Sequence, residues 1–459
     1  MALQFIEEGP SGIGESNRHV IRSHVMRGKN KGRPRRSTKR PKRIEVKEPL
    51  TAPSFASKIP RPVLWGDLCL TSFPKELDLE SMNLMHRWFF DISDALFPPQ
   101  FCNKFDIIQS IWVNYILADE AYFHSTLAIS ASYVDFVRRK AFLSPRTLHH
   151  ISQAYSLVNA KISGPSCVSD SAIAAVVSLA IYQQVHQEPV IGLVHLQGLY
   201  RMISMRGGIS LLMQENRALA LKPLRLDLEL AIQNGTPTLF RSEELPVLPV
   251  HCGTNASTGQ LSIAAPWLPD TITDLLSFSS LLNQAAGGLI SKLDALDYIE
   301  TLTSLLYRVL ETTNLVEASP TTGEMYRHLT QLAMLAFMTT LLPEYTRGGY
   351  SCSLLANRIA IALNGSRTVP PVLSDGRSSL LLWILMISAI SVLNSTDHPW
   401  LRSLIADTSM SLELDDWLAA RNQLCQFPWI FALHDAPARR LWEDMTIMRH
   451  EKHYTAKDG

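Results

Sequence analysis

The sequence predicts an all-α protein with a disordered, basic arm at its N-terminal end, and three observations lead to this fold class. Apolar residues recur at intervals of three and four through most of the 459 residues, as on the buried face of a helix. Glycine and proline mark the ends of many of these stretches. No set of segments alternates polar and apolar residues as half-buried strands do, and neither a fixed-length repeat nor a strand–helix rhythm occurs.

The composition fits a globular helical body. Hydrophobic residues make up 46% of the chain, which is ordinary for a globular protein and ample for a sizeable core. Charged residues make up 19%, below the usual share, so much of the chain should be buried against itself or against a partner. A chain of 459 residues is long enough for one large domain or for a few smaller ones.

Residues 1–60 are predicted to form the disordered arm. Glycines and prolines interrupt this segment, and it holds few apolar groups that could offset the entropy lost on ordering. Eleven lysine or arginine residues and no acidic residue lie between Arg22 and Arg43. Of the 43 basic residues, the other 32 face 42 acidic ones, which leaves the rest of the chain with a net charge of about −10. Any polyanion should therefore contact the arm rather than the body.

Residues 61–450 are predicted to form one helical domain, with order beginning near Pro62. In its first part, Ser81 is the expected N-cap of a helix that ends before Pro98 and Pro99. Three further amphipathic helices are expected before residue 165, and Pro145 separates the last two of them. These three helices are predicted over residues 105–118, 120–140 and 146–162.

The clearest helical pair lies between residues 169 and 208. Ser169 or Asp170 is expected to cap the first helix, because either side chain can accept a hydrogen bond from a backbone N–H of the first turn. A second helix should follow Pro189 and end at Arg206, where the next glycine can adopt the left-handed C′ conformation. We expect the Arg206 side chain to face the negative end of its own helix.

Residues 234–270 break this pattern with prolines, glycines and an Asn-Gly pair. They are predicted to form a long loop, either exposed or at a boundary that divides the helical domain in two. Helical spacing returns in seven later segments. These are 273–284, 289–309, 325–342, 356–364, 378–393, 415–425 and 438–450.

One of these later segments is uncharged and largely apolar, so a membrane-spanning helix is an alternative there. No charged residue occurs from Ser378 to Thr396, a length at the lower limit for a transmembrane helix. Serines and other polar residues dilute the segment, and neither an aromatic belt nor a basic flank marks an interface. We therefore predict a buried core helix and no membrane contact. The N-terminal residues are also too acidic and too briefly apolar for a secretory signal.

No catalytic, cofactor-binding or metal-binding set is recognisable in the sequence. The six cysteines lie at least 33 residues apart, so no CxxC spacing is available for zinc or redox chemistry. His149 and His150 are adjacent, but no ligand spacing joins them to another histidine on one helix face. His195 and the tryptophans are predicted to pack in the core, and Asp415–Asp416 to begin a helix. A pocket for a small effector in the helical body remains open.

Six segments, in their order and spacing, carry a family resemblance: 22–27, 105–124, 170–176, 195–208, 381–385 and 398–401. Together they resemble the fungal-specific transcription factor family. The resemblance implies an all-helical regulatory domain, a nuclear location and control of transcription, often of metabolic gene clusters. Factors of this class often bind DNA through a zinc binuclear cluster built from closely spaced cysteines. This sequence has no such cluster, since its first cysteine is Cys69 and none are grouped.

The basic arm carries the candidate contact residues. Its two dense clusters offer several cations on a flexible strand, which favours binding to the acidic grooves of a nuclear import receptor. The same cations could neutralise DNA phosphates, and Gly32–Arg35 resembles a hook for the minor groove. A solvated tail without a specific partner is the alternative. The candidate residues are Arg33, Arg35, Arg36, Lys39, Arg40, Lys42 and Arg43.

The leading hypothesis is a nuclear transcriptional regulator of a fungal metabolic or biosynthetic gene set, without a cofactor and without enzymatic activity. Its arm would serve import and DNA contact, and its body would bind other transcription factors or a second copy of the chain. Because the zinc cluster is missing, the alternative is an interaction scaffold or co-regulator without direct DNA binding. A third hypothesis is an enzyme whose helical active site has no recognisable motif.

Overall fold

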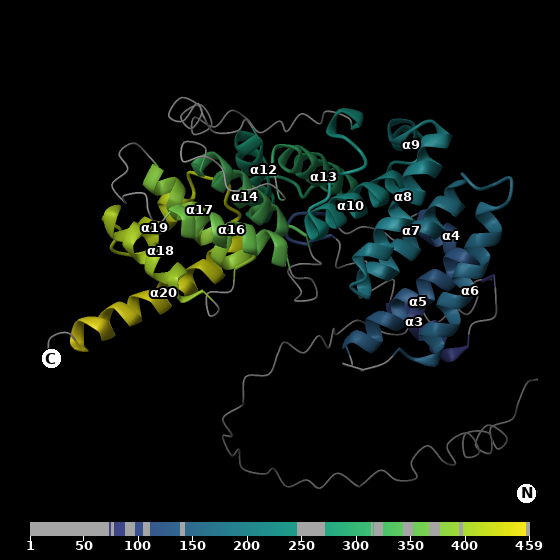
Figure 1. Cartoon of the computed structure of the whole chain (residues 1–459), viewed down its shortest axis with the longest axis horizontal. Coiled ribbons are helices and arrows are strands. Elements are labelled where there is room, and N and C mark those ends of the chain that lie inside the picture. The colour runs from purple at the N-terminus through teal and green to yellow at the C-terminus, as the bar shows by residue number, and fades with distance from the viewer. Residues whose placement is uncertain are drawn as a thin grey trace, which may run out of the picture. The chain divides into compact units, whose positions relative to one another are not determined.

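A computed structural model describes residues 73–74, 78–87, 97–103, 111–137, 143–245, 271–313, 315, 325–342, 352–366, 377–393 and 398–455. These residues belong to one compact unit, Arg61–Gly459. Within them the structure holds sixteen α-helices and one short 3₁₀ helix, with no strand, which confirms the all-α fold (Figure 1). The arm predicted over residues 1–60 lies outside the described residues, as does most of the predicted 234–270 loop.

The first eight helices form what we call the N-terminal region, residues 79–234. Helix α5 is its centre, since it packs against α3, α4, α6 and α7. Its side chains are buried on nearly every face, as expected of a helix surrounded by others. The helices are α3 (Leu79–Arg87), α4 (Ile111–Ala118), α5 (Glu120–Val137), α6 (Pro145–Ile162), α7 (Asp170–Val185), α8 (Pro189–Arg206), α9 (Ile209–Glu215) and α10 (Arg217–Asn234).

Local capping explains where several of these helices begin and end. The Ser169 hydroxyl accepts a hydrogen bond from the backbone N–H of Ala172, which confirms Ser169 as the N-cap of α7. Gly207 closes α8 with φ +115°, and the N–H of Gly208 donates to the carbonyl of Ile203 at 2.9 Å, so this C-terminus is also confirmed.

The prediction of Ser81 as the N-cap of the first helix is wrong. Helix α3 begins at Leu79, three residues before the start that a Ser81 cap implies. The Asp78 carboxylate accepts a hydrogen bond from the backbone N–H of Ser81 at 2.8 Å, so Asp78 performs the capping role. A carboxylate is the stronger cap here, because its charge also favours the positive end of the helix.

The later helices form the C-terminal region, residues 271–455, which follows the 3₁₀ helix η3 (Ser242–Glu244). Helix α10 joins the two regions, because it contacts α7, α8 and α9 as well as α13 and α16. The helices are α12 (Thr271–Ala286), α13 (Ala295–Thr312), α14 (Met325–Thr339), α16 (Ser353–Ser366), α17 (Arg377–Ser391), α18 (Pro399–Ser411), α19 (Trp417–Leu424) and α20 (Phe431–Thr455).

Helix α17 is the centre of the C-terminal region and packs against α14, α18, α19 and α20. Its residues Leu382–Ile387 are completely buried, so the uncharged segment is a core helix, as predicted. Within the described part of the chain, no helix has both the length and the apolar character that a membrane crossing requires. Of the tryptophans predicted as core residues, Trp383 and Trp429 are among the largest fully buried side chains.

Helix α13 starts later than its apolar pattern predicts, at Ala295 rather than Leu289. The Asp294 carboxylate accepts hydrogen bonds from the N–H groups of Leu296 and Asp297, at 2.9 and 3.1 Å, and so fixes the first turn. The preceding residues instead pair with the N-terminal part of the chain. Leu293 donates to Phe101 and accepts from Asn103, both at 2.9 Å, in an isolated parallel bridge.

Candidate functional site

The seven basic residues predicted to contact an import receptor or DNA lie in the arm, outside the described residues. Their role therefore stays a prediction. Within the described part of the chain, three features combine polar chemistry with defined geometry. They are a polar network at the helix ends of the N-terminal region, a groove between α3, α5 and α6, and a small cavity beside α10.

The polar network joins the start of α7 to the ends of α8 and α9. The Asp170 carboxylate forms an ion pair with Arg206 and accepts hydrogen bonds from Asn216 Nδ2 at 2.6 Å and Tyr115 at 3.2 Å. Arg206 also pairs with Glu215 at 2.7 Å. Burial opposes the charge of Asp170, but Arg206 and Asn216 outweigh it and lower the pKa of this carboxyl. Each member has a partner, so the network holds helix ends together and offers no open ligand site.

This network gives Arg206 a role beyond the predicted one. Arg206 lies in the last turn of α8, and its guanidinium also bridges α7 and α9. The planar, bidentate guanidinium suits two carboxylates at once, which explains why an arginine stands there.

The groove lies between α3, α5 and α6 and has a volume of about 660 Å³. This is the size at which proteins commonly bind small molecules. One part of its lining is apolar and the other part is polar or charged. The apolar residues are Leu84, Phe123, Leu127, Ala131, Val134 and Pro145, and the polar ones are Asp78, Glu80, Ser81, His124, Asp135, Ser144, Arg146, His149 and His150.

Among the described lining residues of the groove, one guanidinium pairs with two carboxylates. Arg146 pairs with Asp78 at 2.8 Å and with Glu80 at 3.0 Å. Hydrogen bonds from Ser81, first from its backbone N–H and then from its hydroxyl, together with Arg146, lower the pKa of Asp78 to about 2. The third carboxylate of the described lining, that of Asp135, is buried.

Asp135 is tied to the start of α6. Its carboxylate accepts hydrogen bonds from the backbone N–H of Ser144 at 3.0 Å and from the Thr147 hydroxyl at 3.1 Å. The Ser144 hydroxyl in turn accepts from the N–H of Thr147 and caps the helix. These bonds connect the end of α5 to α6 and so set the width of the groove at that point.

Two buried histidines form the polar wall between α5 and α6. The Nδ1 atoms of His124 and His150 lie 2.9 Å apart, so one must donate the hydrogen bond and the other accept it. His149 lies on the same helix turn, with its ring centroid 5.3 Å from that of His150. Burial, with the neighbouring His124 and His149, lowers the pKa of His150 to about 4. At neutral pH His150 is therefore uncharged and does not offset the carboxylates.

The histidine predicted to pack in the core, His195, does so. The rings of His195 and Tyr155 stack, with centroids 6.1 Å apart and an interplanar angle of 23°, which confirms the predicted packing role. Burial lowers the pKa of His195, and the same is true of His186. Across the described ranges, no group of three or more His, Cys, Asp or Glu side chains is arranged to hold a metal ion.

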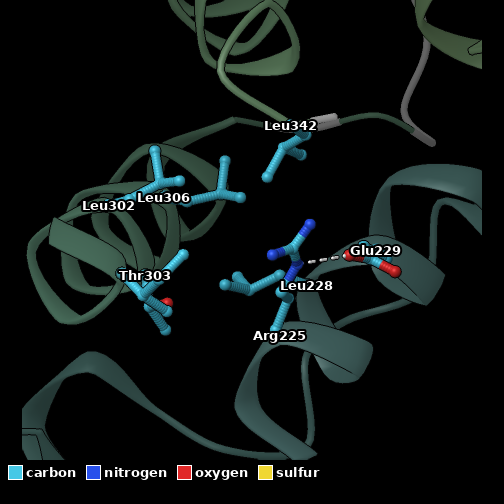
Figure 2. Close-up of a pocket in the computed structure, with 8 residues that line it drawn as sticks. Arg225, Leu228, Glu229, Leu302, Thr303, Leu306 and Leu342 are labelled. Atoms are coloured by element: carbon cyan, nitrogen blue, oxygen red, sulfur yellow. Dashed lines mark hydrogen bonds and ion pairs between the residues drawn. The ribbon is translucent and has the colours of Figure 1, made fainter. Parts of the chain in front are cut away.

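The small cavity beside α10 is too small for a ligand. Its volume is about 10 Å³, which is room for at most one water molecule. Figure 2 shows the Arg225 guanidinium pointing toward Glu229, with Leu228, Leu302, Leu306 and Leu342 around them. The Nε of Arg225 and the carboxylate of Glu229 are 2.8 Å apart. The two charges compensate each other one helix turn apart, so this is a packing site between α10 and α13.

The sequence leaves a pocket in the helical body open but does not predict the position of the groove. His149 and His150 stand out as a pair, but His124 is 26 positions away in the chain. Helical spacing within α6 cannot reveal a partner on α5, because the contact depends on how the two helices pack. Asp416 shows the opposite case. It caps α19 by accepting from the N–H of Ala419 at 2.7 Å, as the local sequence predicted.

Comparison with protein families gives a match to the fungal specific transcription factor domain over residues 92–225. The matched segment contains α4 to α9, with the polar network and the α5–α6 side of the groove. Neither the comparison with curated proteins nor that with solved structures gives a match. The family match confirms the resemblance and points to a regulatory role rather than to catalysis. Residues 92–225 therefore match a fungal specific transcription factor domain, a match that covers less than half of the chain and points to regulation of transcription.

Proposed function

We propose that the protein is a nuclear transcriptional regulator of a fungal metabolic or biosynthetic gene set. In this proposal the basic arm binds an import receptor and contacts DNA, while the helical body binds protein partners. The family match over residues 92–225 carries the proposal. The separation of charge between the arm and the rest of the chain supports assigning the import and DNA contacts to the arm and the protein contacts to the body.

The arm has the chemistry of a polyanion-binding segment. Eleven cations between Arg22 and Arg43, with no acidic residue among them, would release counterions from DNA on binding. The same density of cations suits the acidic grooves of an import receptor. Both interactions are electrostatic, so both should weaken as salt screens the charges.

The body has the chemistry of a protein-binding unit. Outside residues 22–43 the chain carries a net charge of about −10, which opposes close approach of the body to DNA. A zinc binuclear cluster is missing from the sequence, since no two cysteines lie closer than 33 residues. Contacts with a second copy or with another transcription factor would place the arm near its target sites.

Microscopy of a fluorescently tagged full chain in a fungal host tests the import role. Replacing Arg33, Arg35, Arg36, Lys39, Arg40, Lys42 and Arg43 by glutamine should lower the nuclear-to-cytoplasmic ratio several-fold. The control replaces Arg439 and Arg440, two exposed arginines on α20, and should leave the ratio unchanged. A cytoplasmic wild-type protein, or equal ratios for all three proteins, would contradict the proposal.

Direct DNA binding is tested with the purified full chain and a labelled duplex. Fluorescence anisotropy should show binding that weakens steeply with salt, and the seven-glutamine variant should bind much more weakly. A second candidate, a co-regulator that reaches DNA only through a partner, is favoured by the absence of a zinc cluster. In that case the purified chain fails to bind the duplex, and its chromatin occupancy disappears when the partner is deleted.

A further inference from the structure

We propose that helix α8 pairs with α8 of a second copy of the chain, antiparallel across a two-fold axis, and so forms a dimer. This inference rests on the proposed protein-binding role of the body and names one partner for it. Three features of α8 carry it. They are an apolar outer face, the scarcity of charge on that face, and an order of residues that is complementary to itself when reversed.

The outer face of α8 is apolar although it is exposed. Val190, Val194 and Met205 are 72%, 62% and 67% exposed. Their spacing in the helix places all three on one side of it. The opposite side is buried in the core, with Leu199 and Ile203 among its residues. A surface helix normally turns a polar or charged side to water, so a second apolar side indicates a binding partner.

Charged side chains are scarce on α8. Between Pro189 and Arg206 the helix has no acidic residue, and Glu188 precedes it as the N-cap. Arg206 pairs with carboxylates of α7 and α9, so Arg201 is the charged side chain on the outer face. Outside residues 22–43 the chain carries a net charge of about −10, so two copies repel over much of their surface. A two-fold contact is most favourable at a face without carboxylates, and α8 has such a face.

The order of residues along this face suits an antiparallel pair. Val190 lies as far before the midpoint between residues 197 and 198 as Met205 lies after it, and the same holds for Val194 and Arg201. Across a two-fold axis at this midpoint, Val190 of one copy therefore faces Met205 of the other. Val194 faces the aliphatic stem of the opposite Arg201, which can cover it. The two Arg201 residues stay about 10 Å apart along the helix axis, so they do not collide.

Gly198 supplies the space that a close approach of two helices needs. A Cβ placed on Gly198 would have no atom of the chain within 4 Å, so the surface in front of it is open. In the proposed pair, Gln197 of the second copy lies opposite this glycine and its side chain fills the open space. The antiparallel arrangement also places the positive end of each helix dipole beside the negative end of the other.

The neighbouring surface of α6 can extend the contact. The ring of Tyr155 on α6 stacks against that of His195 on α8, so α6 flanks the exposed face. Ser152 and Asn159 lie about one turn before and after Tyr155, and both are exposed and uncharged. Their side chains would form a hydrogen-bonding rim beside the apolar centre, as is common at interfaces between proteins.

Sedimentation equilibrium of the purified full chain, over a range of concentrations, tests the dimer. We expect a mass that rises with concentration toward twice that of the chain. Val194→Arg places a second cation opposite Arg201 and should weaken the dimer at least ten-fold. The control is Leu418→Arg on α19, because Leu418 is 61% exposed and so matches Val194, and it should leave the dimer unchanged. A monomer at every concentration, or equal effects of the two variants, would overturn the proposal.

A charge swap tests the antiparallel pairing. When Arg201→Glu is added to Val194→Arg, each new arginine faces a new glutamate of the second copy. The dimer affinity should then recover to within about three-fold of the wild-type value, and no recovery would overturn the pairing. Both positions are exposed, so the variants should fold, and circular dichroism checks this. The measurement needs neither a nucleus nor DNA, so its failure is distinct from a failure of the import and DNA-binding tests.

Discussion

The N-terminal and C-terminal regions are both helical, yet their interiors differ in chemistry. Among the described residues, the N-terminal region buries six acidic or histidine side chains: Asp119, His124, Asp135, His150, Asp227 and Glu229. The C-terminal region buries Glu300 and His434. The central helices repeat the contrast, since α17 is apolar along Leu382–Ile387, whereas α5 buries serines and threonines together with its titratable groups.

The two interiors are fixed by different interactions, hydrogen bonds in the N-terminal region and apolar packing in the C-terminal region. A buried polar group is costly unless a partner satisfies it, so polar interiors tolerate few arrangements. In α5, Ser125 and Ser132 donate to the carbonyls of Ala121 and Ala128, each at 2.7 Å. Apolar side chains in α17 need only fill the volume that surrounds them. The groove and the polar network both lie in the N-terminal region, where positions are set by directional bonds.

Removal of a large apolar side chain from the C-terminal region should have the largest effect. Trp383 is completely buried in α17, and its Nε1 donates to the carbonyl of Pro428 at 2.9 Å. Trp383→Ala should lower the free energy of unfolding by about 3–5 kcal/mol, because it leaves a cavity and an unpaired carbonyl. The half-buried Trp417 serves as the control, and Trp417→Ala should cost about 1–2 kcal/mol in urea unfolding. Equal losses would mean that packing around α17 is not the main support of this region.

Acid should destabilise both regions through buried histidines. Burial lowers the pKa of His434 to about 3, and burial with the neighbouring histidines lowers that of His150 to about 4, against 6.5 for the ordinary side chain. The unfolded chain therefore binds protons first as the pH falls. The contribution of each histidine is present above pH 6.5 and is lost as the pH falls through its folded pKa, by about 1–3 kcal/mol.

Single substitutions can separate the two histidines. His150→Asn and His434→Asn should each reduce the slope of unfolding free energy against pH between about pH 4 and 6.5. At neutral pH, His434→Asn should lower the free energy of unfolding more than His150→Asn. The reason is that His434 Nδ1 accepts from the N–H of Ile430 at 3.0 Å and its Nε2 bonds Thr340 at 2.9 Å. Urea titrations at several pH values measure both effects. An unchanged slope in both variants would assign the acid sensitivity to other groups.

The polar network predicts an intermediate effect within the N-terminal region. Arg206→Met removes both ion pairs and leaves the half-buried Asp170 with Asn216 and Tyr115 alone. We expect a loss of about 1–2 kcal/mol in unfolding free energy, since the remaining hydrogen bonds satisfy part of the carboxylate. The exposed Arg439, which pairs with Glu443 one turn away on α20, is the matched control. Arg439→Met should change the stability by less than about 0.5 kcal/mol.

Gly198 inside α8 and Gly207 at its C-terminal cap should respond to alanine in opposite directions, and Gly198 should give the smallest effect. Gly207 has φ +115°, and a Cβ there would lie 2.7 Å from Leu211 Cδ2, so Gly207→Ala should destabilise by about 1–2 kcal/mol. Gly198 lies within the helix with no atom within 4 Å of such a Cβ. Gly198→Ala should therefore stabilise by about 0.5–1 kcal/mol. Loss of stability in Gly198→Ala would show that helix propensity does not decide this position.

Local signals made much of the helical order predictable. Ser169, Gly207 and Asp416 act on the backbone within four residues of themselves, so their roles could be inferred from nearby sequence alone. The errors arose where a local signal had a competitor. Asp78 displaced Ser81 as a cap, and Asp294 delayed the start of α13 past the apolar residue Leu289.

The sequence by itself determined the helical class, most helix positions and the charge of the arm, because helix periodicity, caps and net charge are properties of neighbouring residues. Only the tertiary structure decided which polar side chains meet. His124 and His150 are 26 residues apart, and Asp170 and Asn216 are 46 apart, yet each pair is within hydrogen-bonding distance. Such contacts depend on the distances and angles at which helices pack, and many residue choices on one helix are compatible with several packings. The groove therefore follows from the fold, whereas the arm can be recognised from its composition.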